Sequence, residues 1–226
     1  MDIRKWFSPD KLEPIKTRSP DTNKTHEILS PKWEVIKVFT DGSTINNGDK
    51  NARQWGGIGI FFADNDPRNI SKSVIANKIT NNICELLACR LAIEIILKTH
   101  SDISNVLIKL YTDSEYTINC LTKWCINWEK NGWKNAKNKS VKNEQLIKSI
   151  KGLMKKCRIQ FIHVSAHQEE PKNRYKYPEK YELWYGNYMA DKFARDASEQ
   201  SNISSNISSN IDEKREKDTK EVSLET

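Results

Sequence analysis

Four acidic residues have a placement from which their carboxylates could bind metal ions. Asp41 and Asp113 each close an apolar stretch with the same aromatic-Thr-Asp signature, in KVFTDGS and KLYTDSE. If these stretches are neighbouring parallel strands, about 4.8 Å apart, both carboxylates emerge at the same level of one sheet. Carboxylate oxygens are the ligands that Mg²⁺ prefers, and two such ions can activate a water and stabilise the leaving oxygen of a phosphodiester. The pair therefore indicates metal-dependent phosphodiester chemistry.

Each carboxylate taken alone also has a purely structural interpretation. Asp-Gly and Asp-Ser are common turn and cap signals. Glu85 follows Asn82 by three residues, the spacing of a capping box in which Asn82 begins a helix. Asp191 follows Asn187 by four residues, so the two share one helical face, and an exposed helical Asp is the default. One carboxylate at a time, the sequence leaves both interpretations open.

The elements that must position these residues follow from the apolar pattern. WEVIKVFT, GGIGIFFA and KSVIANKI predict three strands in an antiparallel meander, and residues 82–98 have helical spacing. VLIKLYT and RIQFIHVSA predict two further strands, with helical stretches between them over residues 114–156 and a last helix in NYMADKFARDAS. This order predicts an α/β fold, a five-stranded mixed sheet flanked by helices.

The 226 residues suffice for one domain with tails, which we expect at residues 31–200. Residues 1–30 have little periodicity, and 201–226 combine the repeat SNISSNISSNI with a charge-dense run, so both tails are expected to be disordered.

Charge and cysteine content limit the class of protein. A net charge of +7 favours a polyanionic partner, although many basic domains bind none. The five cysteines contain no C-x-x-C pair and predict neither a zinc site nor a disulfide framework. The sequence shows neither a long apolar run nor an apolar signal segment, so we expect a soluble intracellular protein, in the cytoplasm or at a site of DNA replication, without a membrane partner.

The order of the motifs resembles the type 1 ribonuclease H family. Thr80, Asn81, Asn82 and Glu85 match its T-N-N-x-x-E string, and Asp113, Ser114 and Tyr116 match T-D-S-x-Y. Residues 121–143 resemble the basic protrusion of the bacterial members, and the resemblance extends from about Trp33 to Ser198.

This resemblance implies the ribonuclease H fold and an endonuclease that cuts the RNA strand of RNA/DNA hybrids, leaving 5′-phosphate and 3′-hydroxyl ends. It implies two Mg²⁺ ions, with Mn²⁺ as the alternative, held by Asp41, Glu85, Asp113 and Asp191. His167 corresponds to the family's mobile-loop histidine, with His163 as a competing candidate. We expect the chain to act as a monomer. A non-catalytic nucleic-acid binder or an integrase-like nuclease on the same fold are the alternatives.

Substrate contacts also follow from the resemblance. They are assigned to Asn47, Thr80, Asn82 and Asn187, with Trp124 and Lys134 in the basic stretch as contacts to the DNA strand. The alternative for this stretch is that its tryptophans pack and its lysines are solvated.

Two segments depart from the compact members. Residues 168–186 form a longer loop whose aromatic side chains could stack on nucleic acid or pack against the core. The start, MDIRKWF, resembles a sliding-clamp-binding peptide with Ile3, Trp6 and Phe7 as its anchors, but it lacks the leading Gln, and an unremarkable amphipathic start is the alternative.

Overall fold

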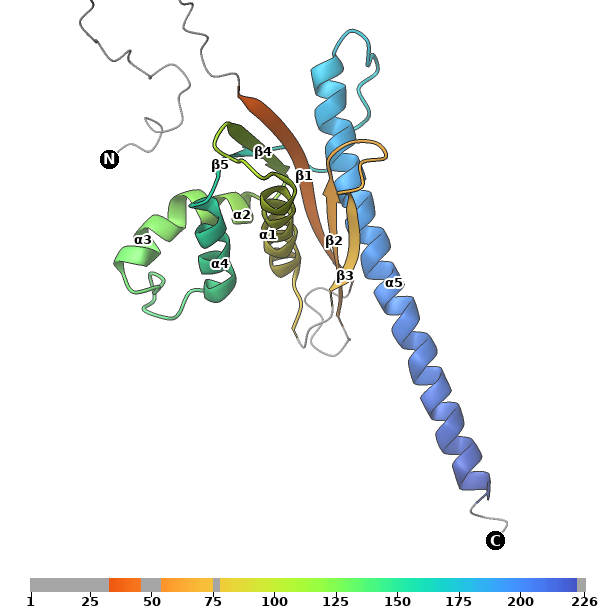
Figure 1. Ribbon diagram of the computed structural model, residues 1–226. Coiled ribbons are helices and arrows are strands. Elements are labelled where there is room, and N and C mark those ends of the chain that lie inside the picture. The colour runs from red at the N-terminus through yellow and green to blue at the C-terminus, as the bar shows by residue number, and fades with distance from the viewer. Residues whose placement is uncertain (1–32, 46–53, 75–77, 223–226) are drawn as a thin grey trace, which may run out of the picture.

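The computed structural model describes residues 33–45, 54–74 and 78–222. A five-stranded sheet in the order β3-β2-β1-β4-β5 forms its centre (Figure 1). The strands β1 to β3 are antiparallel neighbours, whereas β4 pairs in parallel with both β1 and β5. The strands are β1 (Glu34–Ile45), β2 (Trp55–Phe61), β3 (Ile70–Val74), β4 (Val106–Thr112) and β5 (Arg158–His163). The predicted meander and mixed sheet are confirmed.

The register of β1 and β4 brings the two aspartates to one level. Their parallel pairing ends at Phe39 opposite Tyr111, so Asp41 and Asp113 each lie two residues further along. Strand β1 itself continues to Ile45, where it pairs with β2 alone. The expectation that Asp41 ends a strand was therefore wrong, because only the pairing with β4 ends there.

One face of the sheet carries helices α1 (Asn81–Thr99) and α4 (Glu144–Met154), with α1 between the sheet and α4 (Figure 1). Because α1 is covered on both sides, it buries residues around much of its circumference, from Cys84 and Leu86 to Ile93 and Ile96. Between β4 and α4 the chain forms α2 (Glu115–Asn119), a π-helical segment η2 (Cys120–Trp124) and α3 (Cys125–Lys130).

Helix α5 (Pro178–Val222) covers the other face and extends well past the sheet (Figure 1). It packs against β2 and β1 over a second core that contains Phe39, Phe61 and Tyr111. A Cβ atom on Gly59 would collide with the Ala190 carbonyl oxygen, so this glycine lets the helix lie directly on β2. This close packing also fixes the position of the next residue, Asp191, relative to the sheet.

The bounds of α5 correct two expectations. The helix was expected to begin at Asn187, but it begins at Pro178. Proline suits the first position of a helix, and no glycine interrupts the chain until Gly186. The helix also continues through residues 201–222, where disorder was predicted. The repeat in that segment has a period of four residues, close to the helical 3.6. The tail 1–30, with Ile3, Trp6 and Phe7, lies outside the described residues.

Among the residues that the structure describes, no helix is both long and apolar enough to cross a membrane.

Candidate active site

Three of the four predicted carboxylates form one group. Asp41 comes from β1, Glu85 from the second turn of α1 and Asp113 from the residue after β4. One carboxylate oxygen from each lies within 4.8 Å of the other two. Asp41 and Glu85 are 7% and 8% exposed, while Asp113 is partly buried at the open side. These three residues are called the carboxylate centre below.

The carboxylate centre concentrates negative charge in a buried place. Burial raises the pKa of Asp41 to about 7, and the charges of Asp113 and Asp191 add to the rise. Burial, followed by the charges of Asp41 and Asp113, raises the pKa of Glu85 well above its ordinary value. Burial and Asp191 also raise the pKa of Asp113, against the influence of His167 and His163. Like charges held this closely require protons or a cation.

The residues of this centre fit a divalent metal ion. Glu85 Oε2 is a buried oxygen without a hydrogen-bond partner among the described residues. Within the same part of the chain, no Lys or Arg forms an ion pair with any of the three carboxylates. An orphaned oxygen in an all-oxygen, uncompensated acidic group is the donor set that Mg²⁺ and Mn²⁺ accept.

The start of α1 shows why Glu85 faces this centre. Thr80, not Asn82, is the N-cap, and its hydroxyl accepts a hydrogen bond from the Ile83 amide at 3.3 Å. The capping-box alternative for Glu85 was therefore wrong. A Cβ atom on Gly42 would collide with the Glu85 backbone amide, so a glycine directly after Asp41 permits the close approach of α1.

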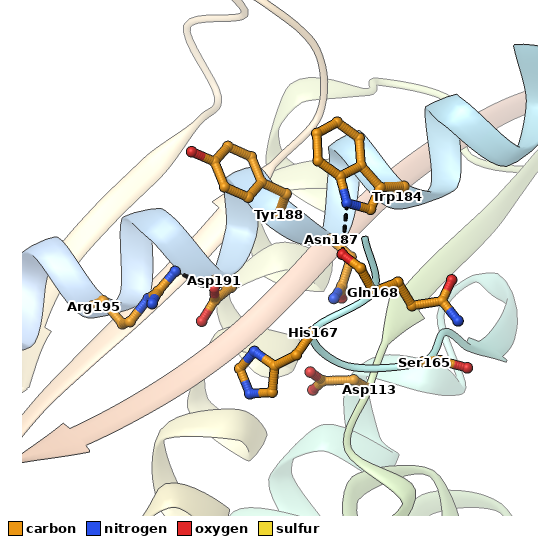
Figure 2. Close-up of a pocket in the computed structure, with 9 residues that line it drawn as sticks. All are labelled: Asp113, Ser165, His167, Gln168, Trp184, Asn187, Tyr188, Asp191 and Arg195. Atoms are coloured by element: carbon orange, nitrogen blue, oxygen red, sulfur yellow. Dashed lines mark hydrogen bonds and ion pairs between the residues drawn. The ribbon is translucent and has the colours of Figure 1, made fainter. Parts of the chain in front are cut away.

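Asp191 lies beside the carboxylate centre and not within the group of three. It lines a pocket together with Asp113, His167 and Asn187 (Figure 2). Its carboxylate forms an ion pair with Arg195, one turn later on α5, at 2.5 Å. Asn187 is buried at 8% exposure on the same helical face, one turn before Asp191. Asp191 is thus near enough to raise the pKa of the other two aspartates, yet its own charge already has a partner.

Both candidate histidines lie near Asp113 but in different positions. His163 ends β5, and its Nε2 lies 3.2 Å from the Asp113 carbonyl oxygen. His167 lies in the following loop with a left-handed φ of 49° and faces the pocket (Figure 2). Only His167 lines the pocket, which favours it as the residue that meets a substrate there. A positive φ is uncommon outside glycine and is often found at functional positions.

The predicted substrate contacts are only partly near this pocket. Thr80 and Asn82 are exposed at the start of α1, and Asn47 lies outside the described residues. Trp124 is 40% exposed at the end of η2, in a chain of rings that continues through Trp128 to Trp133. Trp128 and Trp133 pack against the main core, and Lys148 lies over the Trp133 ring at 4.7 Å.

The lysines of the basic stretch are solvated, as the structural alternative for them expected. All are exposed, and none forms an ion pair within the described residues: Lys123, Lys130, Lys134, Lys137, Lys139 and Lys142.

The pocket also contains residues that were not predicted as site residues. Ser165, Gln168, Trp184, Tyr188 and Arg195 line it with the predicted residues. Arg195 could have been found, since it follows Asp191 by four residues on a predicted helix. Trp184 is one of the inserted aromatic residues whose role, stacking on nucleic acid or packing, the sequence left open, and Tyr188 follows Asn187 on the predicted helix without a motif that marks it.

Comparisons with known proteins agree with this arrangement. The sequence model of the RNase H family matches residues 34–199. Ribonuclease H of Schizosaccharomyces pombe is 34% identical over 174 residues, which cover 77% of this chain and 57% of the relative. Human ribonuclease H1 is 32% identical over 84% of this chain and 57% of its own length. The chain thus spans little more than half the length of these two relatives. Ribonuclease H of Clostridium botulinum strain Hall is 33% identical over 74% of this chain and 98% of its own.

Solved structures have the same fold. The solution structure of the PFV RNase H domain superposes with a TM-score of 0.52 and 26% identity, over 72% of this chain and 93% of that one. LC9-RNase H1, described as a type 1 RNase H with the type 2 active-site motif, gives a TM-score of 0.55 at 20% identity, covering 75% and 74%. The family match over residues 34–199 includes β1 to β5 and all four carboxylates. This chain therefore belongs to the RNase H family.

Proposed function

We propose that this chain is an endonuclease that hydrolyses the RNA strand of RNA/DNA hybrids with two divalent metal ions. The observation that carries the proposal is the carboxylate centre, with its orphaned Glu85 oxygen and no compensating Lys or Arg among the described residues, in a chain of the RNase H family. A non-catalytic binder on this fold would not need to hold three like charges together at such electrostatic cost.

Asp41, Glu85 and Asp113 would hold one metal ion, and Asp41 and Asp191 would share in holding the second. When bound, Mg²⁺ or Mn²⁺ ions supply charge neutralisation at the phosphodiester and activation of the attacking water. The protein supplies the placement: two strands and one helix orient three carboxylates before substrate arrives, so little reorganisation is needed. We infer that cleavage leaves a 5′-phosphate and a 3′-hydroxyl.

His167 is proposed to move a proton at the open side of the pocket. Its ring faces the same pocket as Asp113 and Asp191, and histidine is the side chain that changes charge most readily near neutral pH. The exposed loop position leaves the ring accessible to water, as proton exchange requires.

Hybrid binding is proposed to involve the basic stretch of residues 121–143, which runs from η2 through α3 into the loop before α4. The six exposed lysines without ion pairs in the described chain can contact phosphates, and Trp124 offers a ring to a sugar or base. Asn47, Thr80, Asn82 and Asn187 remain proposed contacts to the substrate backbone.

Cleavage assays with labelled oligonucleotides test this function. Hybrid, duplex RNA and duplex DNA of one sequence are incubated with Mg²⁺, with Mn²⁺ and with EDTA. We expect cutting of the hybrid's RNA strand alone, abolished by EDTA, with products that RNA ligase can rejoin. Asp41→Asn should abolish cutting while hybrid binding persists; Asp102→Asn, an exposed aspartate that is not part of the carboxylate centre, is the matched control. Equal cutting of duplex DNA, or cutting by Asp41→Asn, would refute the proposal.

A sliding clamp is proposed as a further partner, through Ile3, Trp6 and Phe7. Two large aromatic side chains on a short peptide can concentrate binding energy in one hydrophobic pocket. Pull-down with the cognate clamp should fail for the double variant Trp6→Ala/Phe7→Ala. Equal capture of the variant and the parent would reject this partner, and size-exclusion chromatography of the free chain would test the monomeric state.

A further inference from the structure

Four aromatic residues form a stripe at the start of α5. Tyr177 directly precedes the helix, and its carbonyl oxygen accepts a hydrogen bond from the Tyr181 amide at 3.1 Å. Tyr181, Trp184 and Tyr188 follow at spacings of four, three and four, which keeps these three on one helical face. The ring centroids of Tyr181 and Trp184 lie 5.5 Å apart, and those of Trp184 and Tyr188 lie 5.4 Å apart and nearly parallel. These four residues are called the α5 aromatic stripe.

The stripe does not serve as core, unlike its neighbour Tyr185. The Tyr185 ring meets the Phe61 ring edge-on at 5.7 Å, and its hydroxyl donates to Asp64 at 2.8 Å. Tyr177 and Tyr188, by contrast, are 44% and 43% exposed. Between them, Tyr181 and Trp184 are partly buried, and the Tyr181 ring stacks on the Tyr185 ring with centroids 5.9 Å apart. The inserted segment therefore packs through Tyr185 and exposes the two ends of the stripe to solvent. Large exposed rings arranged in a row are typical of binding surfaces.

The stripe leads directly to the active-site pocket. Trp184 and Tyr188 line this pocket with Asp113 and Asp191, and Figure 2 shows both rings side by side on α5 at its rim. The Trp184 indole nitrogen donates to the Gln168 carbonyl oxygen at 2.9 Å, which ties the stripe to the loop that carries His167. A strand leaving the pocket along α5 would pass over these rings.

Cations flank the outer end of the stripe. Lys176 and Lys180 each lie with Nζ 5.2 Å from the Tyr177 ring centroid. In the part of the chain that the structure describes, Lys176 and Lys180 form no ion pair with an acidic residue. Unpaired cations beside stacking rings match the alternating phosphates and bases of a nucleic-acid strand.

We propose that the α5 aromatic stripe binds single-stranded RNA that continues, beyond the end of the hybrid, from the strand lying in the active site. Bases inside a duplex are already stacked on one another, so exposed rings gain most from unpaired bases. The RNA strand is the one that must pass Asp113 and Asp191, whereas the basic stretch after α3 is the proposed DNA contact. This inference rests on the proposed function and adds a preferred substrate, a hybrid with an RNA overhang.

Binding of labelled substrates to the uncut Asp41→Asn protein tests the stripe. Anisotropy titrations compare a blunt hybrid with hybrids that carry ten extra nucleotides of RNA, at the 5′ or the 3′ end, or of DNA. We expect one of the two RNA overhangs to tighten binding by about tenfold, as the stacking of one or two bases would. The DNA overhangs should not do so.

Variants of the stripe then decide the assignment. Tyr177→Ala/Tyr188→Ala should reduce the overhang effect to below about threefold, while Tyr177→Phe/Tyr188→Phe keeps the rings and should retain it. Tyr175→Ala is the matched control, because Tyr175 is 83% exposed in the same insertion but lies off the stripe. A parent protein without overhang preference, a preference that survives the double alanine change, or an equal gain from a DNA overhang would each overturn the inference. Cleavage of blunt hybrid by the wild-type chain would still stand in all three cases, so the proposed function is tested separately.

Discussion

The carboxylate centre and the α5 side of the pocket hold acidic groups in opposite ways. Asp41 and Glu85 are almost fully buried, come from the packed sheet and α1, and lack a basic partner among the described residues. Asp191 is paired with Arg195, whose side chain is 53% exposed, and shares its pocket with a loop histidine. In the carboxylate centre, like charges repel one another and a bound cation would relieve the repulsion. On the α5 side, a cation would have to share the Asp191 carboxylate with Arg195. We therefore expect substitutions on the two sides to reduce cleavage activity by different amounts.

The largest expected difference is between Glu85→Gln and Asp191→Asn. Glu85→Gln keeps the shape but removes the charge of a buried, uncompensated carboxylate proposed to hold metal, so activity on hybrid should fall by about a thousandfold or more. Asp191→Asn removes a charge that Arg195 already partly compensates, and its activity should fall only about ten- to a hundredfold. Rates at saturating Mg²⁺ measure both; equal losses would remove the distinction between the two sides.

A smaller effect is expected at Arg195. If the arginine competes with a cation for Asp191, Arg195→Ala should lower the Mg²⁺ concentration needed for half-maximal activity. An ion pair as exposed as this one is worth up to ~1 kcal/mol, which corresponds to a shift of up to about fivefold. Arg195→Lys, which keeps the charge, is the control. A higher Mg²⁺ requirement in Arg195→Ala would mean that Arg195 positions Asp191 instead.

The last expected effect is not on activity but on the stability of the metal-free chain. The pKa of Asp41 is raised to about 7, above its unfolded value of 3.8, so the folded state binds this proton more tightly. Stability of the metal-free chain is therefore lost as the pH rises from about 4 through about 7. Asp41→Asn removes the charge and should raise the melting temperature at pH 8 by about 4 °C, or ~1–2 kcal/mol. Thermal unfolding in EDTA measures this, and Mg²⁺ should stabilise the parent more than the variant.

Much of the fold could be predicted from the sequence because its signals are local. The alternating stretch before Asp41 and the apolar run before Asp113 each predicted a strand, and the spacing within residues 82–98 predicted α1 nearly to its ends. The bounds of α5 could not be predicted so well. Its first turns carry aromatic residues at helical spacing, but they follow an irregular polar loop that was expected to continue to Gly186, and the helix forms where Tyr185 packs on Phe61 and the aromatic rings stack.

In the candidate site too, some residues could be predicted from the sequence and others could not. The motifs of Glu85 and Asp113 predicted both as metal ligands before their geometry was known, and the structure groups them with Asp41. The role of the aromatic residues in the insertion stayed open, because a ring can pack or stack on a ligand with equal ease. The structure packs the ring of Tyr185 against Phe61 and places Trp184, its neighbour in the insertion, at the pocket.

The sequence by itself predicted which residues would carry the chemistry of this protein, namely four carboxylates and a histidine in the order of one nuclease family, on predictable strands and helices. Only the tertiary structure decided how those residues are held. It placed Asp41, Glu85 and Asp113 together with an orphaned oxygen and turned Trp184 toward the pocket. The physical reason is that residue type and local period are written along the chain. Burial, the grouping of the carboxylates and the approach of α5 to the sheet depend instead on contacts between segments that lie far apart in the sequence.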